Sequence, residues 1–402
     1  MGGVPPNRFL GLGRREERHI ASDPMVNERV LAERLISYDT SRPEELVAAA
    51  GFVKGWLESR EIEVHEHDHN GMPALVAEVG PPAAPGTPCV VLHGHLDVVP
   101  GLPEQFSPRL EGDRLIGRGA YDMKGGLAAM MCALKDLGSS APVRVRLLCV
   151  PDEESEELDE RCTDALVAGG LGGDFAITGE PTDLHIGIQA KGVLALRIQV
   201  HGRAAHGSTP WLGDNAVLKA IDVFRAIESL PFTRESSELF DRPSINLGRI
   251  AGGDAVNRVP DWCTMVVDIR YLPGQDPAHL LEEIGAIEGT EVTRTFIHPP
   301  VTVSTADPYV QSLRDAVARV APEIEILSVG RDGASDAASF IEAGIPAVEF
   351  GPTGGGHHGP DEWVSLSSLQ RYRHALRDFV RSLPVQLRRR DPRTDLYAGG
   401  VA

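Results

Sequence analysis

The 402-residue sequence predicts an α/β fold in which a smaller α+β unit interrupts the main sheet-containing unit. Three observations support this prediction. Short apolar runs alternate with segments of helical spacing, several apolar runs stop at a polar or glycine-rich break, and the middle of the chain has its own succession of strands and helices. A chain of this length is too long for one ordinary core and favours two domains.

The first part of the chain is predicted to alternate helices and strands. Apolar residues at helical spacing indicate the helices, and short apolar runs bounded by turn residues indicate the strands. The predicted elements are, in order, helices at 27–37 and 44–58, strands at 64, 75–79 and 89–92, a buried helix at 124–137, and strands at 143–150 and 175–178. The run HEHDH at residues 65–69 is interpreted as a solvated loop between strands.

From residue 192 the pattern changes to a strand, a helix, two strands, a helix and a last strand. This succession predicts a compact α+β unit with its own apolar faces, which ends near His298. The chain then returns to the α/β pattern, and a strand at 346–350 stops at GPTGGGHH. We therefore expect an inserted domain within a discontinuous one.

The composition excludes several classes of protein. A net charge of −19 disfavours nucleic acid as a partner. No apolar run reaches about 18 residues, so no membrane span is expected, and the N-terminus lacks a secretory signal. The five cysteines are scattered without a C-x-x-C pair, which predicts buried free thiols, no thiolate zinc site and a cytoplasmic location.

Five candidate metal ligands lie at breaks in five separate stretches of the chain. Four follow an apolar strand, where an α/β sheet places its ligand site, and the fifth precedes the helix at 124–137. Two imidazoles and three carboxylates suit a pair of divalent ions, for which Zn²⁺ is expected and Co²⁺ or Mn²⁺ would also serve. The five are His95 in HGHLDVVPG, Asp122 in GRGAYDMKGG, Glu154 in PDEES, Glu180 in ITGEPTD and His358 in GGGHHGPDEW.

Neighbours of these ligands leave alternatives open. His93 has the same strand parity as His95, and His357 adjoins His358, so each could compete for the ligand role. Asp97 could accept a hydrogen bond from the ring nitrogen of His95 that binds no metal. Asp122 could bridge two ions, cap the following helix, or do both.

A carboxylate that is not needed as a ligand stands beside Glu154. Glu153 could face the attacking water and accept its proton, since a positioned carboxylate can pass a proton from water to a leaving amine. On charge content alone, the run DEESEELDE would be a solvated loop. Its position at the end of an apolar strand favours a catalytic role.

Taken together, HGHLDVVP, GRGAYDMKGG, DEES, GEP, GRAAHGSTPWLGDNA and HHGPDEW resemble one family over about residues 27–384. This family, the co-catalytic zinc amidohydrolases and peptidases, includes acetylornithine deacetylase, succinyl-diaminopimelate desuccinylase, aminoacylase-1 and carboxypeptidase G. The resemblance implies a discontinuous zinc-binding α/β catalytic domain with a mixed or parallel sheet and an inserted α+β lid that dimerises. The expected parts are an N-terminal tail (1–24), the catalytic domain (25–191 and 299–384), the lid (192–298) and a C-terminal tail (385–402).

The resemblance also implies a role for each matched residue. His95 and Glu180 would hold one metal ion and Glu154 and His358 the other, Asp122 would bridge them, Glu153 would be the general base and Asp97 the partner of His95. In the lid, His206 of GRAAHGS would reach the partner subunit's site and stabilise the oxyanion, which is a large catalytic effect. Asn257, Arg270 and Ser335 would bind the substrate, Arg270 through a two-pronged contact with its carboxylate.

The implied activity is hydrolysis of the amide bond of an N-acyl amino acid by a hydroxide held between two metal ions. A dipeptidase or carboxypeptidase of the same architecture is the alternative, and a non-catalytic binding or dimerisation relative is a remote one. GASDAASF lacks the Gly-Arg-Phe ending of the desuccinylases, which argues against a succinyl preference. Arg258 replaces the usual Val or Ile and could meet a second substrate acid or face water.

Overall fold

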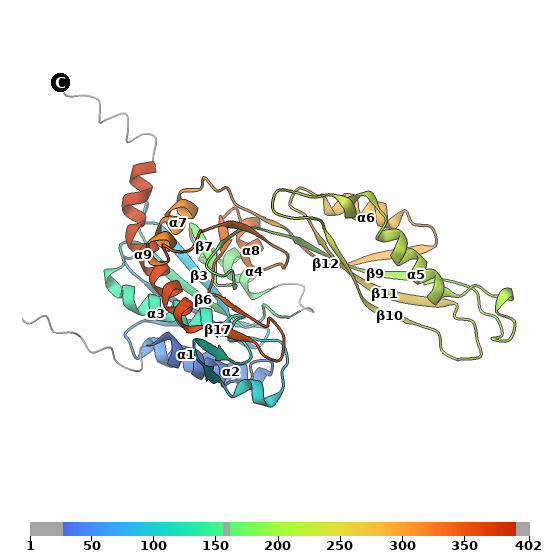
Figure 1. Cartoon of the computed structure of the whole chain (residues 1–402), viewed down its shortest axis with the longest axis horizontal. Coiled ribbons are helices and arrows are strands. Elements are labelled where there is room, and N and C mark those ends of the chain that lie inside the picture. Colours follow the sequence, from blue (N-terminus) through green and yellow to red (C-terminus); the bar gives the residue numbers. More distant parts are fainter. Residues whose placement is uncertain (1–26, 156–160, 391–402) are drawn as a thin grey trace, which may run out of the picture.

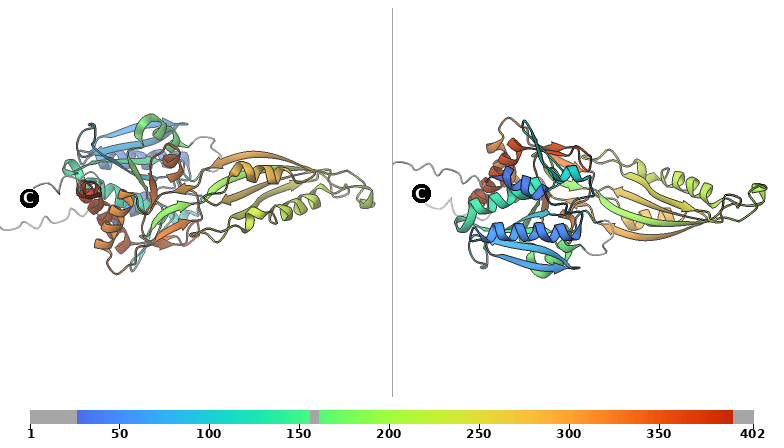
Figure 2. Two further views of the ribbon diagram at one scale, coloured as in Figure 1. Left: turned by 90° about the horizontal axis from the view of Figure 1, so that it is seen from above. Right: turned by 90° about the horizontal axis from the view of Figure 1, so that it is seen from below.

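The computed structural model describes residues 27–155 and 161–390, which form two lobes (Figure 1). The larger lobe holds a mixed sheet with helices packed on it, and the smaller lobe extends away from it along the β9 and β12 strands. The views in Figure 2 show the small lobe as a long, thin extension. The α/β fold class with a second α+β unit is therefore confirmed.

The elements of the larger lobe come from both ends of the chain. Its helices are α1 (Glu28–Ile36), α2 (Pro43–Glu58), α3 (Lys124–Leu137), α4 (Cys162–Leu166), α7 (Pro308–Val320), α8 (Ala337–Glu342) and α9 (Leu366–Arg390). Its main-sheet strands are β1 (Val64–His69), β2 (Met72–Val79), β3 (Cys89–His95), β6 (Arg144–Val150), β7 (Phe175–Thr178), β8 (Ile186–Ala190), β13 (Val301–Thr302), β14 (Ser328–Arg331) and β15 (Ala347–Glu349). Helix α3 and strand β7 have the predicted bounds.

The main sheet has the order β1-β2-β6-β3-β7-β15-β8-β13 among the described residues, with β14 beside β8. Its centre is parallel: β3 pairs with β6 and β7, and β7 pairs with β15. Every residue of β3 is buried, which explains its nearly continuous apolar run, since central parallel strands are covered on both faces. The carboxyl ends of β3, β6 and β7 therefore lie at one edge of the sheet.

A small second sheet joins two distant parts of the larger lobe. It has the order β16-β17-β5-β4, with β4 at Arg109–Glu111, β5 at Arg114–Ile116, β16 at Gly354–Gly355 and β17 at Trp363–Ser365. Because β17 pairs with β5, the loop before α3 is brought next to the loop between β16 and β17. The strands of this sheet are only two or three residues long, which is too short for a recognisable strand pattern in the sequence.

The smaller lobe is a four-stranded antiparallel sheet with the order β10-β11-β9-β12. Its elements are β9 (Gly192–His201), α5 (Ala216–Ile227), β10 (Ser244–Gly252), β11 (Trp262–Tyr271), α6 (Pro277–Gly285) and β12 (Thr290–His298). Alternate residues of β9 and β11 point to one face and join α5 and α6 in a hydrophobic cluster separate from that of the larger lobe. We keep the domain boundaries at 191/192 and 298/299 as a proposal.

The prediction of a solvated loop at residues 65–69 is wrong. These residues form β1, which pairs residue by residue with β2 at the edge of the main sheet. Most of the polar side chains of β1 are exposed, so backbone pairing and not an apolar pattern makes this segment a strand. The last of them, His69, turns inward and its Nε2 lies 3.4 Å from an Asp152 carboxylate oxygen.

Two further expectations concern the thiols and the membrane. All five cysteines are free and buried, as predicted. Among the helices at residues 27–155 and 161–390, none combines the length and apolar character needed to cross a membrane. The predicted N-terminal tail at 1–24 lies outside the described residues. Of the predicted C-terminal tail at 385–402, residues 385–390 belong to helix α9, and residues 391–402 lie outside the described residues.

Helix α9 offers a test of which ion pairs stabilise the larger lobe. Arg373 contacts Glu28 of α1 at 2.6 Å and Asp136 of α3 at 2.8 Å, and all three side chains are at most 16% exposed. We expect Arg373→Ala to lower the free energy of unfolding by about 3 kcal/mol, because two buried carboxylates lose their cation. Urea denaturation measures the change.

The control on the same helix is Arg371→Ala. Arg371 pairs with Glu323 on the surface, where the two side chains are 40% and 54% exposed. Its loss should cost less than about 1 kcal/mol. Equal effects of the two substitutions would contradict the assignment.

Candidate active site

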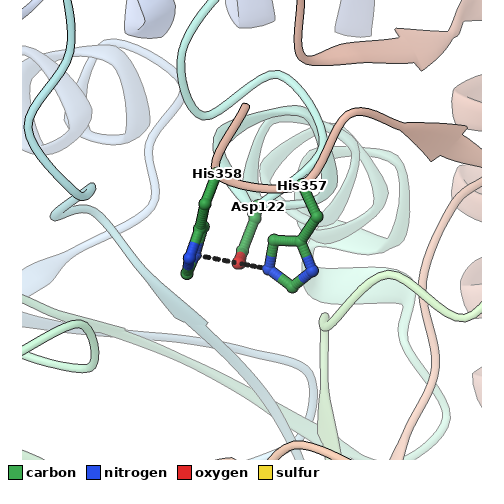
Figure 3. A group of neighbouring side chains, drawn as sticks. All are labelled: Asp122, His357 and His358. Atoms are coloured by element: carbon green, nitrogen blue, oxygen red, sulfur yellow. Dashed lines mark hydrogen bonds and ion pairs between the residues drawn. The ribbon is translucent and has the colours of Figure 1, made fainter. Parts of the chain in front are cut away.

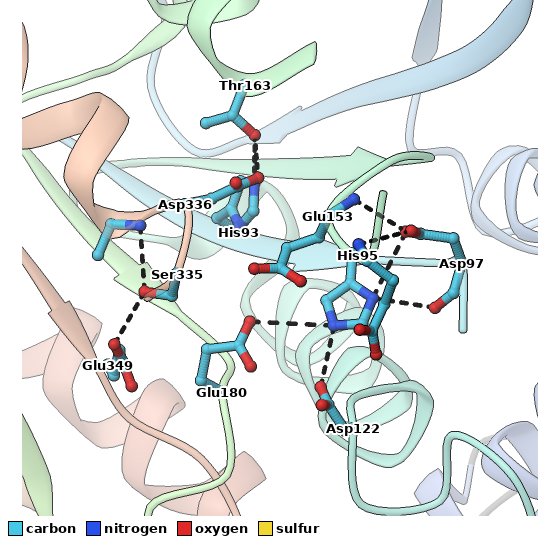
Figure 4. Close-up of polar contacts among 12 residues, drawn as sticks. His93, His95, Asp97, Asp122, Glu153, Thr163, Glu180, Ser335, Asp336 and Glu349 are labelled. Atoms are coloured by element: carbon cyan, nitrogen blue, oxygen red, sulfur yellow. Dashed lines mark hydrogen bonds and ion pairs between the residues drawn. The ribbon is translucent and has the colours of Figure 1, made fainter. Parts of the chain in front are cut away.

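The fold brings the five predicted ligands together at the carboxyl edge of the main sheet. Parallel pairing of β3 with β6 and β7 aligns the ends of these strands, and the β5–β17 pair adds the two loops that contribute from elsewhere. The ligands are placed as follows: His95 ends β3, Glu154 lies in the turn after β6, Glu180 follows β7, Asp122 precedes α3, and His358 lies between β16 and β17 (Figures 3 and 4).

Asp122 lies at the centre of this group. One of its carboxylate oxygens is 3.0 Å from His95 Nε2, and the other is 3.3 Å from His358 Nε2 and contacts His357 Nε2 (Figure 3). Although burial opposes ionisation, the three imidazoles hold the pKa of Asp122 well below its usual range. Asp122 makes no side-chain cap for α3, whose N-cap residue is Met123, so the capping alternative is not what the structure contains.

His358 also reaches a second carboxylate. Its Nε2 lies 3.1 Å from Glu154 Oε1, so it stands between Glu154 and Asp122. Hydrogen bonds that His358 donates to these two carboxylates raise its pKa to about 10. The neighbouring His357 contacts the Asp122 carboxylate and packs edge-on against His358, and both imidazoles are roughly half exposed. Both histidines remain candidate ligands, and only His358 joins the two carboxylates.

Glu180 completes the cluster from the opposite side. Its Oε1 lies 3.9 Å from His95 Nε2 and has no hydrogen-bond partner among the described residues, although it is buried. Burial and the neighbouring Asp122 raise the pKa of the Glu180 carboxyl well above its usual value. A buried carboxylate oxygen without a partner is costly unless a cation or a water satisfies it.

The donor set fits divalent metal ions. Ligand atoms of His95, Asp122 and Glu154 lie within 4.8 Å of one another, and so do those of Asp122, His357 and His358. Both groups mix imidazole nitrogen with carboxylate oxygen, which suits zinc and similar ions, and both include Asp122. The unpartnered oxygen of Glu180 points to the same conclusion.

Asp97 supports the cluster in two ways. Its main-chain oxygen lies 3.0 Å from His95 Nδ1, and because a carbonyl can only accept, Nδ1 carries the proton and Nε2 is left for a metal. Its carboxylate lies 3.5 Å from the same nitrogen and accepts the backbone N–H groups of Glu153 at 3.2 Å and Glu154 at 2.8 Å. The second role was not predicted, because it depends on the turn after β6 folding over residue 97.

The Glu153 side chain stands beside the ligands without joining either group. Its carboxyl group is 13% exposed, and Figure 4 shows it on the same side as Glu180 and His95. Burial raises the pKa of Glu153 to about 8, while His95 and Arg161 act in the opposite direction. A carboxyl group whose pKa lies near neutrality can both accept and donate a proton.

Two residues that sequence reasoning missed connect the loops of the site. Glu362 accepts the backbone N–H groups of Tyr121 at 3.0 Å and Asp122 at 3.1 Å, and its other oxygen is paired with Arg118 at 2.7 Å. Arg118 also donates to the main-chain oxygen of His358 at 3.1 Å. Both residues lie within the motifs GRGAYDMKGG and HHGPDEW, and two opposite charges there were the available signal.

His93, the rival of His95, is not part of the cluster. It is buried, and its Nε2 lies 2.8 Å from Thr163 Oγ1 and 3.2 Å from Asp336 Oδ2. The two histidines lie two residues apart on β3, but His93 contacts Thr163 and Asp336 whereas His95 contacts Asp122.

The predicted lid residues His206 and Asn257 are exposed. His206 Nδ1 lies 2.8 Å from Ser208 Oγ, and its backbone forms an isolated bridge with Arg258. Among the described residues, neither makes a hydrogen bond or ion pair with the ligand cluster of the same chain. Arg258 pairs with two carboxylates of its own turn, at 254 and 261, each at 2.6 Å.

The other two predicted substrate-binding residues already have partners. On β11, Arg270 Nε donates to Asp268 at 3.0 Å, and both side chains are 33% exposed. Ser335 is buried and its hydroxyl donates to Glu349 at 2.8 Å (Figure 4). The structure thus gathers the predicted ligands, Glu153 and Asp97, and leaves His206, Asn257 and Arg270 in the smaller lobe.

Comparison with known proteins agrees with this arrangement. The family described as Peptidase family M20/M25/M40 matches residues 91–382. The N-acetyl-L-citrulline deacetylase of Xanthomonas campestris pv. campestris is 29% identical over 362 residues, which cover 85% of this chain and 93% of that protein. The acetylornithine deacetylase of Photorhabdus laumondii is 32% identical over 304 residues, which cover 70% of this chain and 76% of that protein.

Solved structures show the same fold. The M20 family metallo-carboxypeptidase Sso-CP2 from Sulfolobus solfataricus matches with a TM-score of 0.73 at 20% identity, over 89% of this chain and 99% of that chain. The family match spans most of the described residues; it begins within β3, and of the main-sheet strands only β1 and β2 lie wholly outside it. The chain therefore belongs to peptidase family M20/M25/M40, and it is a metal-dependent hydrolase of amide bonds.

Proposed function

We propose that this hydrolase removes the acyl group from an N-acyl amino acid that keeps a free carboxylate. The observation that carries the proposal is the position of Glu153: its side chain is only 13% exposed, and it stands beside a cluster that fits metal ions without belonging to either ligand group. The names of the two relatives described above, both deacetylases of modified amino acids, support this substrate class.

In this proposal His95, Asp122, Glu154, Glu180 and His358 hold two divalent ions, for which we propose Zn²⁺. When bound, such ions polarise the amide carbonyl and lower the pKa of the attacking water. Asp97 keeps the proton of His95 on Nδ1, so that Nε2 faces the site. Glu362 and Arg118 hold the backbone of the two loops that supply Asp122 and His358.

Glu153 acts as the general base. It accepts a proton from the attacking water and delivers it to the nitrogen of the leaving amine, so the carboxyl group is regenerated at the end of each cycle. Its low exposure keeps bulk water from competing for that proton.

The lid residues complete the site in a homodimer. We propose that His206 reaches the partner subunit's site and stabilises the oxyanion, and that Asn257, Arg270 and Ser335 contact the substrate, with Arg270 leaving Asp268 for the substrate carboxylate. The smaller lobe offers a surface for a second copy: β10 is an edge strand of its sheet, and Leu218 and Ile221 of α5 are exposed.

The five buried thiols support a reducing, cytoplasmic location.

A dipeptidase or carboxypeptidase is the second candidate. The structural neighbour Sso-CP2 carries the name of a metallo-carboxypeptidase, and the same groups would cleave a peptide amide. A non-catalytic role is disfavoured, because all five predicted ligands and Glu153 are present in this chain.

The substrate class is tested with a panel of N-acetyl, N-succinyl and N-formyl amino acids and dipeptides, with release of free amine as the measurement. We expect turnover of N-acyl amino acids, loss of that turnover after chelation, and its recovery with added Zn²⁺, Co²⁺ or Mn²⁺. Amidation of the substrate carboxylate should raise KM sharply. Faster cleavage of dipeptides would favour the second candidate, and activity that survives complete chelation would contradict both.

The role of Glu153 is tested with Glu153→Gln, which keeps the size of the side chain and removes its basicity. We expect kcat to fall by about 10²–10⁴-fold, the usual contribution of a general base, while the metal content measured by mass spectrometry stays at the wild-type value. Glu111→Gln, at an exposed carboxylate on β4, is the control and should leave both unchanged. Wild-type kcat in Glu153→Gln would exclude the base assignment.

The dimer is tested with Leu218→Asp combined with Ile221→Asp on α5. We expect the wild-type protein to be dimeric by light scattering and the variant to be monomeric, because two buried charges oppose the contact. The monomer should keep its metal ions and lose turnover, since His206 would no longer reach a partner. Val47→Asp, at an exposed apolar residue of α2, is the control. A fully active monomer would contradict the role of His206 in the partner's site.

A further inference from the structure

A buried charged cluster lies behind Glu153, and the mechanism proposed above does not use it. It consists of Arg161, Asp336, Thr163 and His93, which come from the start of α4, the residue before α8, and β3. Asp336 and His93 have no exposed side-chain surface, and the Arg161 side chain is 14% exposed. Buried charges of this kind are expensive unless each is paired.

Arg161 contacts both the backbone and the side chain of Glu153. Its Nη1 donates to the main-chain oxygen of Glu153 at 2.7 Å and lies 3.3 Å from the carboxylate oxygen Oε1 of the same residue. The same nitrogen contacts Asp336 Oδ1 at 3.0 Å. A guanidinium in this position limits both the backbone of the turn and the direction of the Glu153 side chain.

The backbone of Glu153 is therefore held from both sides. Asp97 accepts its N–H at 3.2 Å, and Arg161 donates to its C=O at 2.7 Å. One anchor comes from the segment after β3 and the other from the residue before α4, so neither of the two peptide groups that flank the Glu153 Cα can turn without breaking a hydrogen bond. Glu153 lies in a turn after β6, where regular structure does not fix its orientation.

Arg161 is in turn fixed by Asp336. The second oxygen of Asp336 accepts the Thr163 hydroxyl at 2.5 Å and lies 3.2 Å from His93 Nε2 (Figure 4). His93 also packs edge-on against Phe340, with 5.7 Å between the ring centres. These contacts give Asp336 a single position, and the guanidinium that pairs with it is fixed as well.

We propose that Arg161 is a positioning residue for the hydrolytic reaction: anchored by Asp336, it holds the Glu153 carboxyl group in the orientation that faces the ligand cluster. This inference rests on the proposed role of Glu153 as the base. The competing explanation is that Arg161 only neutralises the buried Asp336, in which case its loss would lower stability and leave kcat unchanged.

The test compares Arg161→Gln and Arg161→Lys with the wild-type metal-loaded enzyme on the best substrate of the panel. We expect Arg161→Gln to lower kcat by about 100-fold, the effect of a displacement of about 1 Å, with KM and metal content near wild type. Arg161→Lys should retain more activity, because an ammonium can still reach one of the acceptors. Added guanidinium ion should partly restore Arg161→Gln. If Arg161→Gln does not fold, Arg161→Lys alone carries the test, with a fall in kcat at constant KM expected.

Arg146→Lys is the matched control. Arg146 is buried too, pairs with Glu78 at 2.9 Å and donates to the main-chain oxygen of Leu171 at 2.8 Å. Neither of these partners is a candidate metal ligand. We expect this variant to lower Tm and leave kcat unchanged. Wild-type kcat in both Arg161 variants would overturn the proposal.

The pair Glu153→Gln and Arg161→Gln separates this inference from the proposed function. If Arg161 acts through Glu153, the double variant should be no slower than Glu153→Gln alone. A multiplicative loss would overturn the positioning role. An active Glu153→Gln would overturn the proposed base, whereas an inactive Glu153→Gln with a fully active Arg161→Gln would remove only the present inference.

Discussion

The structure of the site depends on bringing several carboxyl groups into one small buried space. Asp122, Glu153 and Glu180 repel one another there, and burial adds to the cost of ionising each of them. Three imidazoles offset the charge of Asp122, while Glu180 keeps an oxygen with no partner among the described residues. Such an arrangement is costly unless cations enter it, which favours the binding of metal ions at this edge of the sheet.

The rest of the larger lobe serves to hold these groups against their repulsion. Parallel strands set the position of His95 and Glu180, and the small β5–β17 sheet ties the loop of Asp122 to that of His358. Three other carboxylates support the ligands from behind. Asp97 and Glu362 accept hydrogen bonds from backbone N–H groups, and Glu362 and Asp336 also pair with the guanidinium groups of Arg118 and Arg161. The carboxylates that bind groups of the protein therefore support the carboxylates that are the candidate metal ligands.

The two lobes have different tasks in this arrangement. The larger lobe contains the complete ligand cluster and Glu153. The smaller lobe carries His206 and Asn257 at exposed positions and Arg270 at a partly exposed one. His206 contacts Ser208 and Arg270 pairs with Asp268, and among the described residues none of the three is bonded to the ligand cluster. The candidate ligands therefore lie together in one lobe, and the proposed substrate contacts of the smaller lobe require that lobe, or a second copy of it, to close over them.

The sequence alone determined the fold class and the bounds of α3 and β7, and it supplied the candidate ligands as a prediction, because apolar periodicity and the residues at strand ends are local signals. It could not determine β1, which is polar and is a strand only through its pairing with β2, nor the short strands β5 and β17. The second role of Asp97 and the contacts of Glu362 and Arg161 were also decided by the tertiary structure. Each of these contacts joins residues from different segments of the chain. The sequence pattern of one segment does not show which residue of another segment will contact it.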